Sequence, residues 1–197
     1  MEPVPGVFMG LYLYLNEHSH ADTWINGGVI PIQPASTYRK LERDGIYTPD
    51  ENLIHKSPFD LFSLSPVLDL RGFGHFSMNN LMVNGVQVPN VSDVSLYEED
   101  GLILSFSCRY KKKTAIRMKK KACVKILDVD ALKKHLDEKL GVEAIAKDCE
   151  YTQGHERNHF LKSNADQWQA EFRMFWPILE RVEVELPPGV ATLMRKW

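Results

Sequence analysis

Short runs in which hydrophobic and polar residues alternate recur along the chain, and they are typical of β-strands with one buried face. The alternation of valine and glutamate over residues 181–186 is a clear case. The Asn84-Gly85 pair between apolar residues predicts a tight hairpin over residues 82–88. We expect strands over residues 7–15, 29–33, 94–97, 102–110, 122–127, 148–153 and 181–186.

Other segments have helical spacing. Leucine recurs every fourth residue within 128–140, after the capping residue Asp128 and before Gly141, which predicts the best helix of the chain. A shorter helix is expected over residues 17–26, where two glycines follow. The same spacing of four residues relates three aromatic side chains that a helix would bury together in the core, namely Trp168, Phe172 and Trp176.

The order of these segments predicts the fold class. Strands outnumber helices, and the rhythm of about 30 residues that marks strand–helix–strand units is missing, so a doubly wound nucleotide-binding fold is not expected. There is no internal repeat and no low-complexity linker, so residues 1–197 are expected to form one α+β domain. The polar, turn-rich segment 35–60 is long for a connection, and such length is typical of functional or mobile loops.

Composition narrows the class of protein. The chain has 197 residues, of which 44% are apolar and 25% charged, as in ordinary globular domains. Three cysteines without a C-x-x-C pair predict free, reduced thiols. The N-terminal segment lacks the basic start of a signal peptide, and no stretch approaches the ~18 apolar residues of a membrane span. We therefore expect a cytoplasmic protein with no membrane partner.

One segment is strongly basic although the net charge of the whole chain is -2. Residues 109–121 carry eight cations and no acid. Its position between two predicted strands suggests a hairpin or loop that projects from the sheet. Such a patch attracts nucleic-acid phosphates, whereas the simpler alternative is an edge protected by lysines. The candidate nucleic-acid-binding residues are Arg109, Lys111, Lys112, Lys113, Arg117, Lys119, Lys120 and Lys121.

Residues 155–159, HERNH, match the H-E-x-x-H pattern of zinc proteases. In such a site His155 and His159 lie one helical turn apart and bind the metal, while Glu156 polarises the bound water. The residues around the motif favour turns over the long apolar helix that such a site needs. We therefore expect no metal site, and a zinc hydrolase remains the less favoured alternative.

The remaining motifs resemble, in order, parts of the ADP-ribosyltransferase superfamily, in a bacterial and phage-associated branch that includes nucleic-acid-modifying toxins. The similarity covers most of the chain. The segments that carry it are Gly10-Leu-Tyr-Leu-Tyr-Leu15, residues 22–32, Ala35-Ser-Thr-Tyr38, Gly101-Leu-Ile-Leu-Ser-Phe-Ser107, Phe160-Leu-Lys162 and Trp168-Gln-Ala-Glu171-Phe-Arg173. The resemblance implies a mixed, mostly antiparallel split sheet with few helices.

The resemblance also implies roles for individual residues. Glu171 would be the catalytic carboxylate, and NAD the cofactor. Ser105 and Ser107 are two apart, so on a strand their hydroxyls point to the same face. A tyrosine stands in the first strand where the family usually has His or Arg. The candidate NAD-binding residues are Tyr12, Tyr14, Ser36, Tyr38, Arg39, Ser105, Ser107 and Lys162.

These observations together predict an NAD-dependent ADP-ribosyltransferase of a toxin or phage-defence system. Nucleic acid is the favoured acceptor because of the basic block, a protein acceptor is the alternative, and a toxin of this kind would also have a cognate antitoxin. A non-catalytic nucleic-acid-binding module that uses residues 109–121 is the main competing hypothesis.

Overall fold

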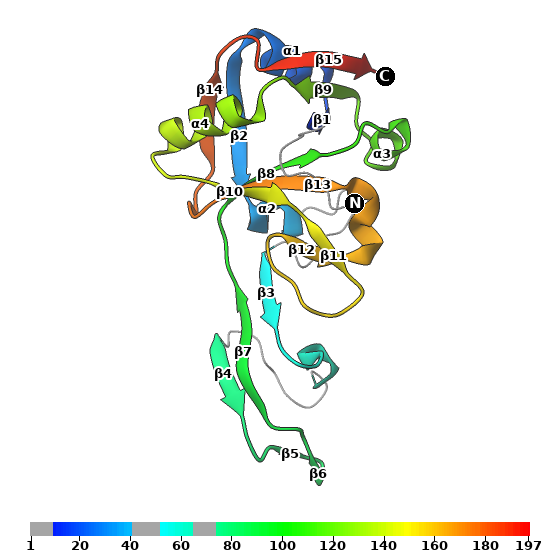
Figure 1. Cartoon of the computed structure of the whole chain (residues 1–197), viewed down its shortest axis with the longest axis vertical. Coiled ribbons are helices and arrows are strands. Elements are labelled where there is room, and N and C mark those ends of the chain that lie inside the picture. The colour runs from blue at the N-terminus through cyan, green and yellow to red at the C-terminus, as the bar shows by residue number, and fades with distance from the viewer. Residues whose placement is uncertain (1–9, 41–51, 65–73) are drawn as a thin grey trace, which may run out of the picture.

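Eight antiparallel strands form the main sheet, which fills the upper part of the molecule in Figure 1. The computed structural model describes residues 10–40, 52–64 and 74–197. Along the main path the strands are β10 (Ile145–Asp148), β13 (Glu171–Trp176), β8 (Leu102–Ser107), β1 (Tyr12–Leu15), β9 (Ala122–Ile126) and β15 (Ala191–Lys196). The remaining two are β2 (Gly28–Pro34), which pairs with β8, and β14 (Val182–Leu186), which pairs with β2.

The sheet divides beside β8. One edge of β8 pairs with β13 along its whole length, from Leu102 opposite Trp176 to Ser107 opposite Glu171. Its other edge pairs with β2 at Leu102 and Ile103 and with β1 only at Ser107. Strand β1, followed by β9 and β15, therefore joins β8 at its Ser107 end, and β2, followed by β14, joins it at its Leu102 end.

One face of this sheet carries the main core. Two helices, α1 (His18–Asn26) and α4 (Val129–Leu140), contribute the buried side chains Trp24, Leu132 and Leu136 to it. The α4 helix has the ends expected from the sequence, because the Asp128 side chain accepts a hydrogen bond from the Ala131 N–H at 2.9 Å and Gly141 has a φ of 72°. The predicted helix over 128–140 is confirmed.

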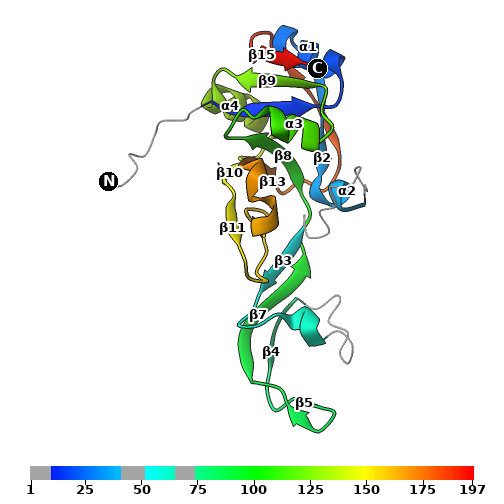
Figure 2. The same ribbon diagram turned by 90° about the vertical axis from the view of Figure 1, so that its right-hand side faces the viewer.

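A β-arm extends from one end of this body in both views (Figures 1 and 2). Its three-stranded antiparallel sheet has the order β3 (Leu53–Lys56), β7 (Val91–Glu98) and β4 (His75–Met78), with the short 3₁₀ helix η1 (Leu61–Leu64) packed against it. The arm has its own small core around Leu61, Val94 and Leu96. Its sheet therefore does not depend on the main core for burial.

The distal hairpin of the arm confirms the turn predicted from Asn84-Gly85. Strand β5 (Met82–Val83) pairs with β6 (Val86–Gln87), and Asn84 and Gly85 have φ values of 50° and 78°. Positive φ at both central residues is what a type I′ turn requires.

The arm meets the body at the loop that contains the HERNH motif. His55 of β3 and Arg157 exchange two backbone hydrogen bonds of 2.9 Å. The Glu99 N–H also donates to the Asn52 carbonyl at 2.9 Å. This loop joins β11 (Glu150–Thr152) to β12 (Leu161–Ser163), which form a parallel pair.

The coarse prediction of one α+β domain with few helices and mostly antiparallel sheets is confirmed. The helix predicted from the three aromatic residues is wrong. A 3₁₀ helix, η2 (Asn164–Gln169), ends at Ala170, whose φ of 48° is left-handed, and β13 follows. Phe172 and Trp176 are buried on one face of that strand, whereas Trp168 lies in η2 and is partly exposed.

Two further expectations need correction. The basic block is not a hairpin or plain loop, because it contains the helix α3 (Lys112–Arg117). The segment 35–60 is not one long loop, since it begins with α2 (Ala35–Lys40) and includes β3, while residues 41–51 lie outside the described part of the chain. Among the described residues, no helix is long and apolar enough to cross a membrane.

Gly101 is a sensitive point where the arm strand β7 leads into β8. A Cβ atom at this position would lie 2.5 Å from the Phe175 ring and 2.5 Å from the Trp176 carbonyl oxygen. We expect Gly101→Ala to lower the free energy of unfolding by about 1–3 kcal/mol, as overpacking of a core does. Urea unfolding measures this change. Gly74→Ala is the matched control, because no atom of the described residues lies within 4 Å of its added Cβ, and equal midpoints for the two variants would contradict the prediction.

Candidate active site

Three adjacent strands present polar side chains in one row across the sheet. Tyr12 of β1 lies opposite Ser107 of β8, and Ser107 lies opposite Glu171 of β13. Side chains that are directly opposite in an antiparallel sheet point to the same face, and so do residues two apart on one strand. Tyr14 and Ser105 therefore share this face, which is opposite to the face that carries the main core.

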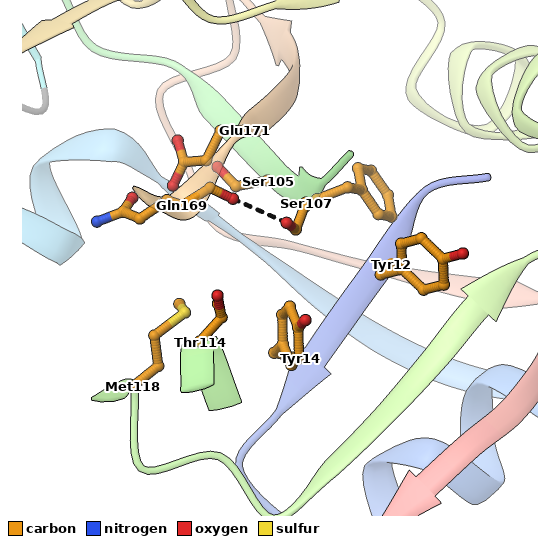
Figure 3. Close-up of a pocket in the computed structure, with 9 residues that line it drawn as sticks. Tyr12, Tyr14, Ser105, Ser107, Thr114, Met118, Gln169 and Glu171 are labelled. Carbon is orange, nitrogen blue, oxygen red and sulfur yellow. Dashed lines mark hydrogen bonds between the residues drawn. The ribbon is translucent and has the colours of Figure 1, made fainter. Parts of the chain in front are cut away.

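A pocket of about 40 Å³ opens at this row. Figure 3 places Glu171 and Gln169 on one side of it and Thr114 and Met118 of the α3 region on the other. The lining residues are Tyr12, Tyr14, Ser105, Phe106, Ser107, Thr114, Met118, Gln169 and Glu171. Four of the predicted NAD-binding residues and the predicted catalytic carboxylate thus line one pocket.

Two buried cations hold the Glu171 carboxylate. Arg173 Nε donates to Glu171 Oε2 at 2.8 Å, and Lys162 Nζ donates to the same oxygen at 3.2 Å. Burial raises the pKa of the Glu171 carboxyl, but the charges of Arg173 and Lys162 outweigh this effect and bring the pKa below its ordinary value. The carboxylate is therefore ionised at neutral pH.

Further contacts fix the orientation of the carboxylate. The Glu171 backbone N–H donates to the Tyr151 hydroxyl at 2.9 Å, and the Cys149 thiol lies 4.0 Å from Oε2. Burial raises the pKa of Tyr151 above its ordinary value, so that hydroxyl stays neutral. The side-chain contacts of Arg173, Lys162 and Cys149 thus all converge on Oε2 of the carboxylate.

The hydroxyls of Tyr14 and Ser107 hold the start of the basic block. The Lys111 N–H donates to the Tyr14 hydroxyl at 2.7 Å, and burial raises the pKa of that phenol to about 12. Ser107 Oγ lies 2.8 Å from the Gln169 carbonyl and 3.0 Å from the Arg109 carbonyl, so it can donate to either. These two side chains line the pocket, but their hydroxyl groups already make hydrogen bonds to the protein backbone.

Several predicted site residues lie elsewhere. The Ser36 N–H donates to the Asp100 carboxylate at 3.0 Å, so α2 and its residue Tyr38 lie near the Gly101 end of β8, away from Ser107. The side chain of Arg39 lies outside the described residues. Lys162, also predicted to bind NAD, is buried and donates to Glu171 and to Gln169 Oε1 at 3.1 Å.

Four residues of the pocket lining are not among the predicted site residues, namely Thr114, Met118, Gln169 and Phe106. A basic block interpreted as a loop hides the first two, and the aromatic spacing that suggests a helix hides Gln169. The alternation of polar residues at 171 and 173 does not extend to Gln169, because this residue lies in η2, before Ala170 and outside β13.

The basic block forms the outer wall of the pocket. The inward side of α3 buries Thr114 and Ala115, while seven of the eight cations are exposed and Lys120 is half-buried. The Arg117 guanidinium lies 4.0 Å from the centre of the Trp168 ring, a cation–π contact between α3 and η2. At the far end Lys121 contacts Glu17 at 2.8 Å. All eight predicted cations therefore lie on one segment that also borders the pocket.

The HERNH segment does not form a zinc site. It is a turn rather than a helix, and its two histidines have separate surroundings. His155 Nε2 lies 2.8 Å from the Ser57 carbonyl, whereas His159 Nε2 lies 3.0 Å from Glu99 Oε2 and its ring stacks on Phe175. No group of three or more His, Cys, Asp or Glu in the described residues could hold a metal.

Comparison of the chain with protein-family models, curated proteins and solved structures finds no match.

The pocket fits part of NAD but not all of it. It offers a carboxylate, aromatic rings and hydroxyls, which suit a ribose and a planar ring. Its volume of about 40 Å³ has room for a few water molecules, whereas pockets for cofactors usually measure ~300–1,000 Å³. At this volume only a fragment such as the hydroxyl edge of a ribose would fit, and a complete dinucleotide would enter only if a wall moved.

The histidines at the base of the arm predict loss of stability in acid. His55 is buried, its Nε2 lies 3.0 Å from Ser57 Oγ, and its ring centre is 5.0 Å from that of His155. Burial lowers the pKa of His55 below 6.5, His155 and Arg157 lower it further, and Asp60 and Glu156 oppose them. The unfolded chain then binds more protons than the folded chain as the pH falls through about 6.5, so stability decreases there.

We expect the free energy of unfolding of the wild-type protein to fall between about pH 7 and pH 5, by about 1.4 kcal/mol for each unit by which the pKa of His55 is lowered. His55→Gln, which cannot titrate, should show a weaker pH dependence in urea unfolding. His20→Gln, at an exposed position, is the control. The same pH dependence in His55→Gln and the wild type would refute this assignment.

Proposed function

We propose that this protein is an NAD-dependent ADP-ribosyltransferase of a toxin or defence type, with Glu171 as its catalytic carboxylate. One observation carries the proposal: residues 12, 105, 107 and 171, which are far apart in the sequence, line the same pocket. The resemblance assigned these positions to the first strand, the serine-bearing strand and the catalytic segment. Their convergence on one pocket supports the assignment of Glu171 as the catalytic carboxylate. A Glu171 carboxylate on the outer surface, away from the first strand and the serine-bearing strand, would have excluded that assignment.

The chemistry follows from the ionised state of Glu171. Breaking the bond between nicotinamide and ribose leaves positive charge on the ribose. A fixed carboxylate stabilises that charge, and it can hold a ribose hydroxyl or take a proton from the attacking group. Arg173 and Lys162 hold the carboxylate through Oε2, and a ligand in the pocket would meet its other oxygen. The rings of Tyr12 and Tyr14 would pack against the bound ligand.

The acceptor that suits this site best is a nucleic acid. The exposed cations of the basic block lie on the segment that forms one wall of the pocket. A polymer bound to them by its phosphates would pass directly beside Glu171. A protein acceptor with an acidic surface is the alternative, and a toxin of this kind would act in the cytoplasm and have an antitoxin as partner.

The same cations favour the second candidate function, a nucleic-acid-binding module without catalysis. Exposed cations are sufficient for that role, and it requires nothing of Glu171. Replacing Glu171 distinguishes the two candidates. A transferase would lose its transferase activity, whereas a binding module would show only nucleic-acid binding, with or without Glu171.

The proposal is tested by transfer of labelled ADP-ribose from NAD to RNA, to DNA and to protein of a cell lysate. Glu171→Gln should reduce transfer by about 10²–10⁴-fold, the usual contribution of a positioned acid or base. Glu185→Gln, on the exposed side of β14, is the matched control and should keep wild-type transfer.

Glu171→Gln leaves Arg173 and Lys162 buried with less compensating charge, so its folding must be checked by circular dichroism. Glu171→Asp provides a second variant, because it keeps the negative charge but withdraws the carboxylate by one methylene. A shift of about 1 Å can cost about 10²-fold in rate, so we expect a comparable loss with the fold retained. Full transfer by both variants, or no transfer by the wild-type protein to any acceptor, would overturn the proposal.

A further inference from the structure

Aromatic side chains border the exposed cations of the basic block next to the pocket. Trp168 is partly exposed in η2 and lies beneath the Arg117 guanidinium, 4.0 Å from it. Tyr110, between Arg109 and Lys111, is partly exposed and its ring centre lies 5.7 Å from that of Tyr12, which lines the pocket. This surface therefore combines positive charge with two partly exposed aromatic rings.

The Trp168 side chain carries an unused hydrogen-bond donor. Its indole Nε1 is buried and has no hydrogen-bond partner within the described part of the chain. Buried indole N–H groups usually donate to an acceptor. Arg117 covers the ring, so the guanidinium must turn outward before a ligand can use the ring face. An arginine that leaves an indole can bind a phosphate instead, because both contacts use the same planar cation.

The two sides of α3 connect this surface with the pocket. Lys112 and Lys113 are exposed on the same short helix whose buried residue Thr114 lines the pocket. A phosphate backbone held by these lysines would bring its nearest base to the boundary between α3 and η2, where Trp168 lies. Stacking of bases on aromatic rings together with a cationic track is the usual mode of binding single strands.

We infer that the polymer bound here is a single-stranded nucleic acid, with phosphates on Arg109 and Lys111–Lys113 and one unstacked base on Trp168. A duplex fits the arrangement poorly, because its bases remain stacked and paired, and none can stack on Trp168 without extrusion. The inference rests on the proposed function only for what happens to the strand after it binds. Binding itself needs neither NAD nor Glu171.

The test measures binding by fluorescence anisotropy in the absence of NAD. The probes are a single-stranded DNA, a single-stranded RNA and a DNA duplex of about 12 units each, within the ~4–16-nucleotide size of known single-strand sites. Each is titrated with the full chain at about 50 and about 200 mM salt. We expect at least one of the single strands to bind about tenfold or more tightly than the duplex, with affinity that falls steeply as salt rises.

Three variants locate the contacts. Replacing Lys111, Lys112 and Lys113 together by serine should weaken single-strand binding about tenfold or more and flatten its salt dependence. The matched control replaces Lys134 and Lys139, exposed on α4, and should leave binding unchanged. Trp168→Ala should weaken binding about 5- to 150-fold, as loss of one stacked base does, whereas Trp168→Phe should retain most of it.

Equal affinity for duplex and single strands, together with wild-type binding by Trp168→Ala, would overturn the inference. So would tighter binding of polyglutamate than of either single strand, since that outcome identifies an acidic protein as the partner. If single strands bind as expected but no ADP-ribose is transferred, the proposed catalysis fails while this inference stands. Transfer of ADP-ribose to protein without strand binding would support the proposed catalysis and overturn this inference.

Discussion

The structure around the candidate site depends on one buried cluster of charge, in which Glu171 lies between Arg173 and Lys162. Removing three charged groups from water costs several kcal/mol for each ion, and their mutual attraction repays this only when the geometry is good. An apolar cluster of similar volume would often stabilise the fold as well or better. Stability alone therefore does not account for an ionised carboxylate beside a pocket, whereas the chemical role proposed for Glu171 would.

This cluster also links the site to the arm. Arg173 Nη1 donates to the His159 carbonyl at 2.8 Å, and the His159 ring contacts Glu99, which follows the arm strand β7. The HERNH segment thus resembles a metal motif in sequence but works as a turn that contacts the arm on one side and the guanidinium that orients Glu171 on the other. These contacts run from Glu99 through His159 to Arg173, so a displacement of the arm would also shift the Arg173 guanidinium.

The sequence predicted those parts of the fold that depend on local interactions. The Asn84-Gly85 hairpin and the capped helix after Asp128 follow from backbone preferences of a few neighbouring residues. The helix expected around Trp168 failed because a spacing of four is also compatible with a strand that buries Phe172 and Trp176 on one face. The meeting of Tyr12, Ser107 and Glu171 depends on long-range strand register, which no local pattern determines. Likewise Lys162 gave no sign in the sequence that it would be buried against Glu171, because that contact joins side chains of two different strands, β12 and β13.

The size of the pocket indicates which wall must move for the proposed reaction. Tyr12, Ser105 and Glu171 belong to strands in the middle of the main sheet, where movement would break ladders of backbone hydrogen bonds. The opposite wall is the short helix α3, which meets the body through the Tyr14 hydroxyl, through Arg117 on Trp168 and through its buried residues Thr114 and Ala115. The cation–π contact contributes only about 0.5–1 kcal/mol at a partly exposed site, but Ala115 also packs in a small core with Tyr14 and Cys123 and adds to the cost of moving the helix. In the proposed reaction, a strand that draws Arg117 and the neighbouring lysines outward would enlarge the pocket if it moved α3 with them. Binding of the acceptor and admission of the complete dinucleotide would then depend on the same movement of α3.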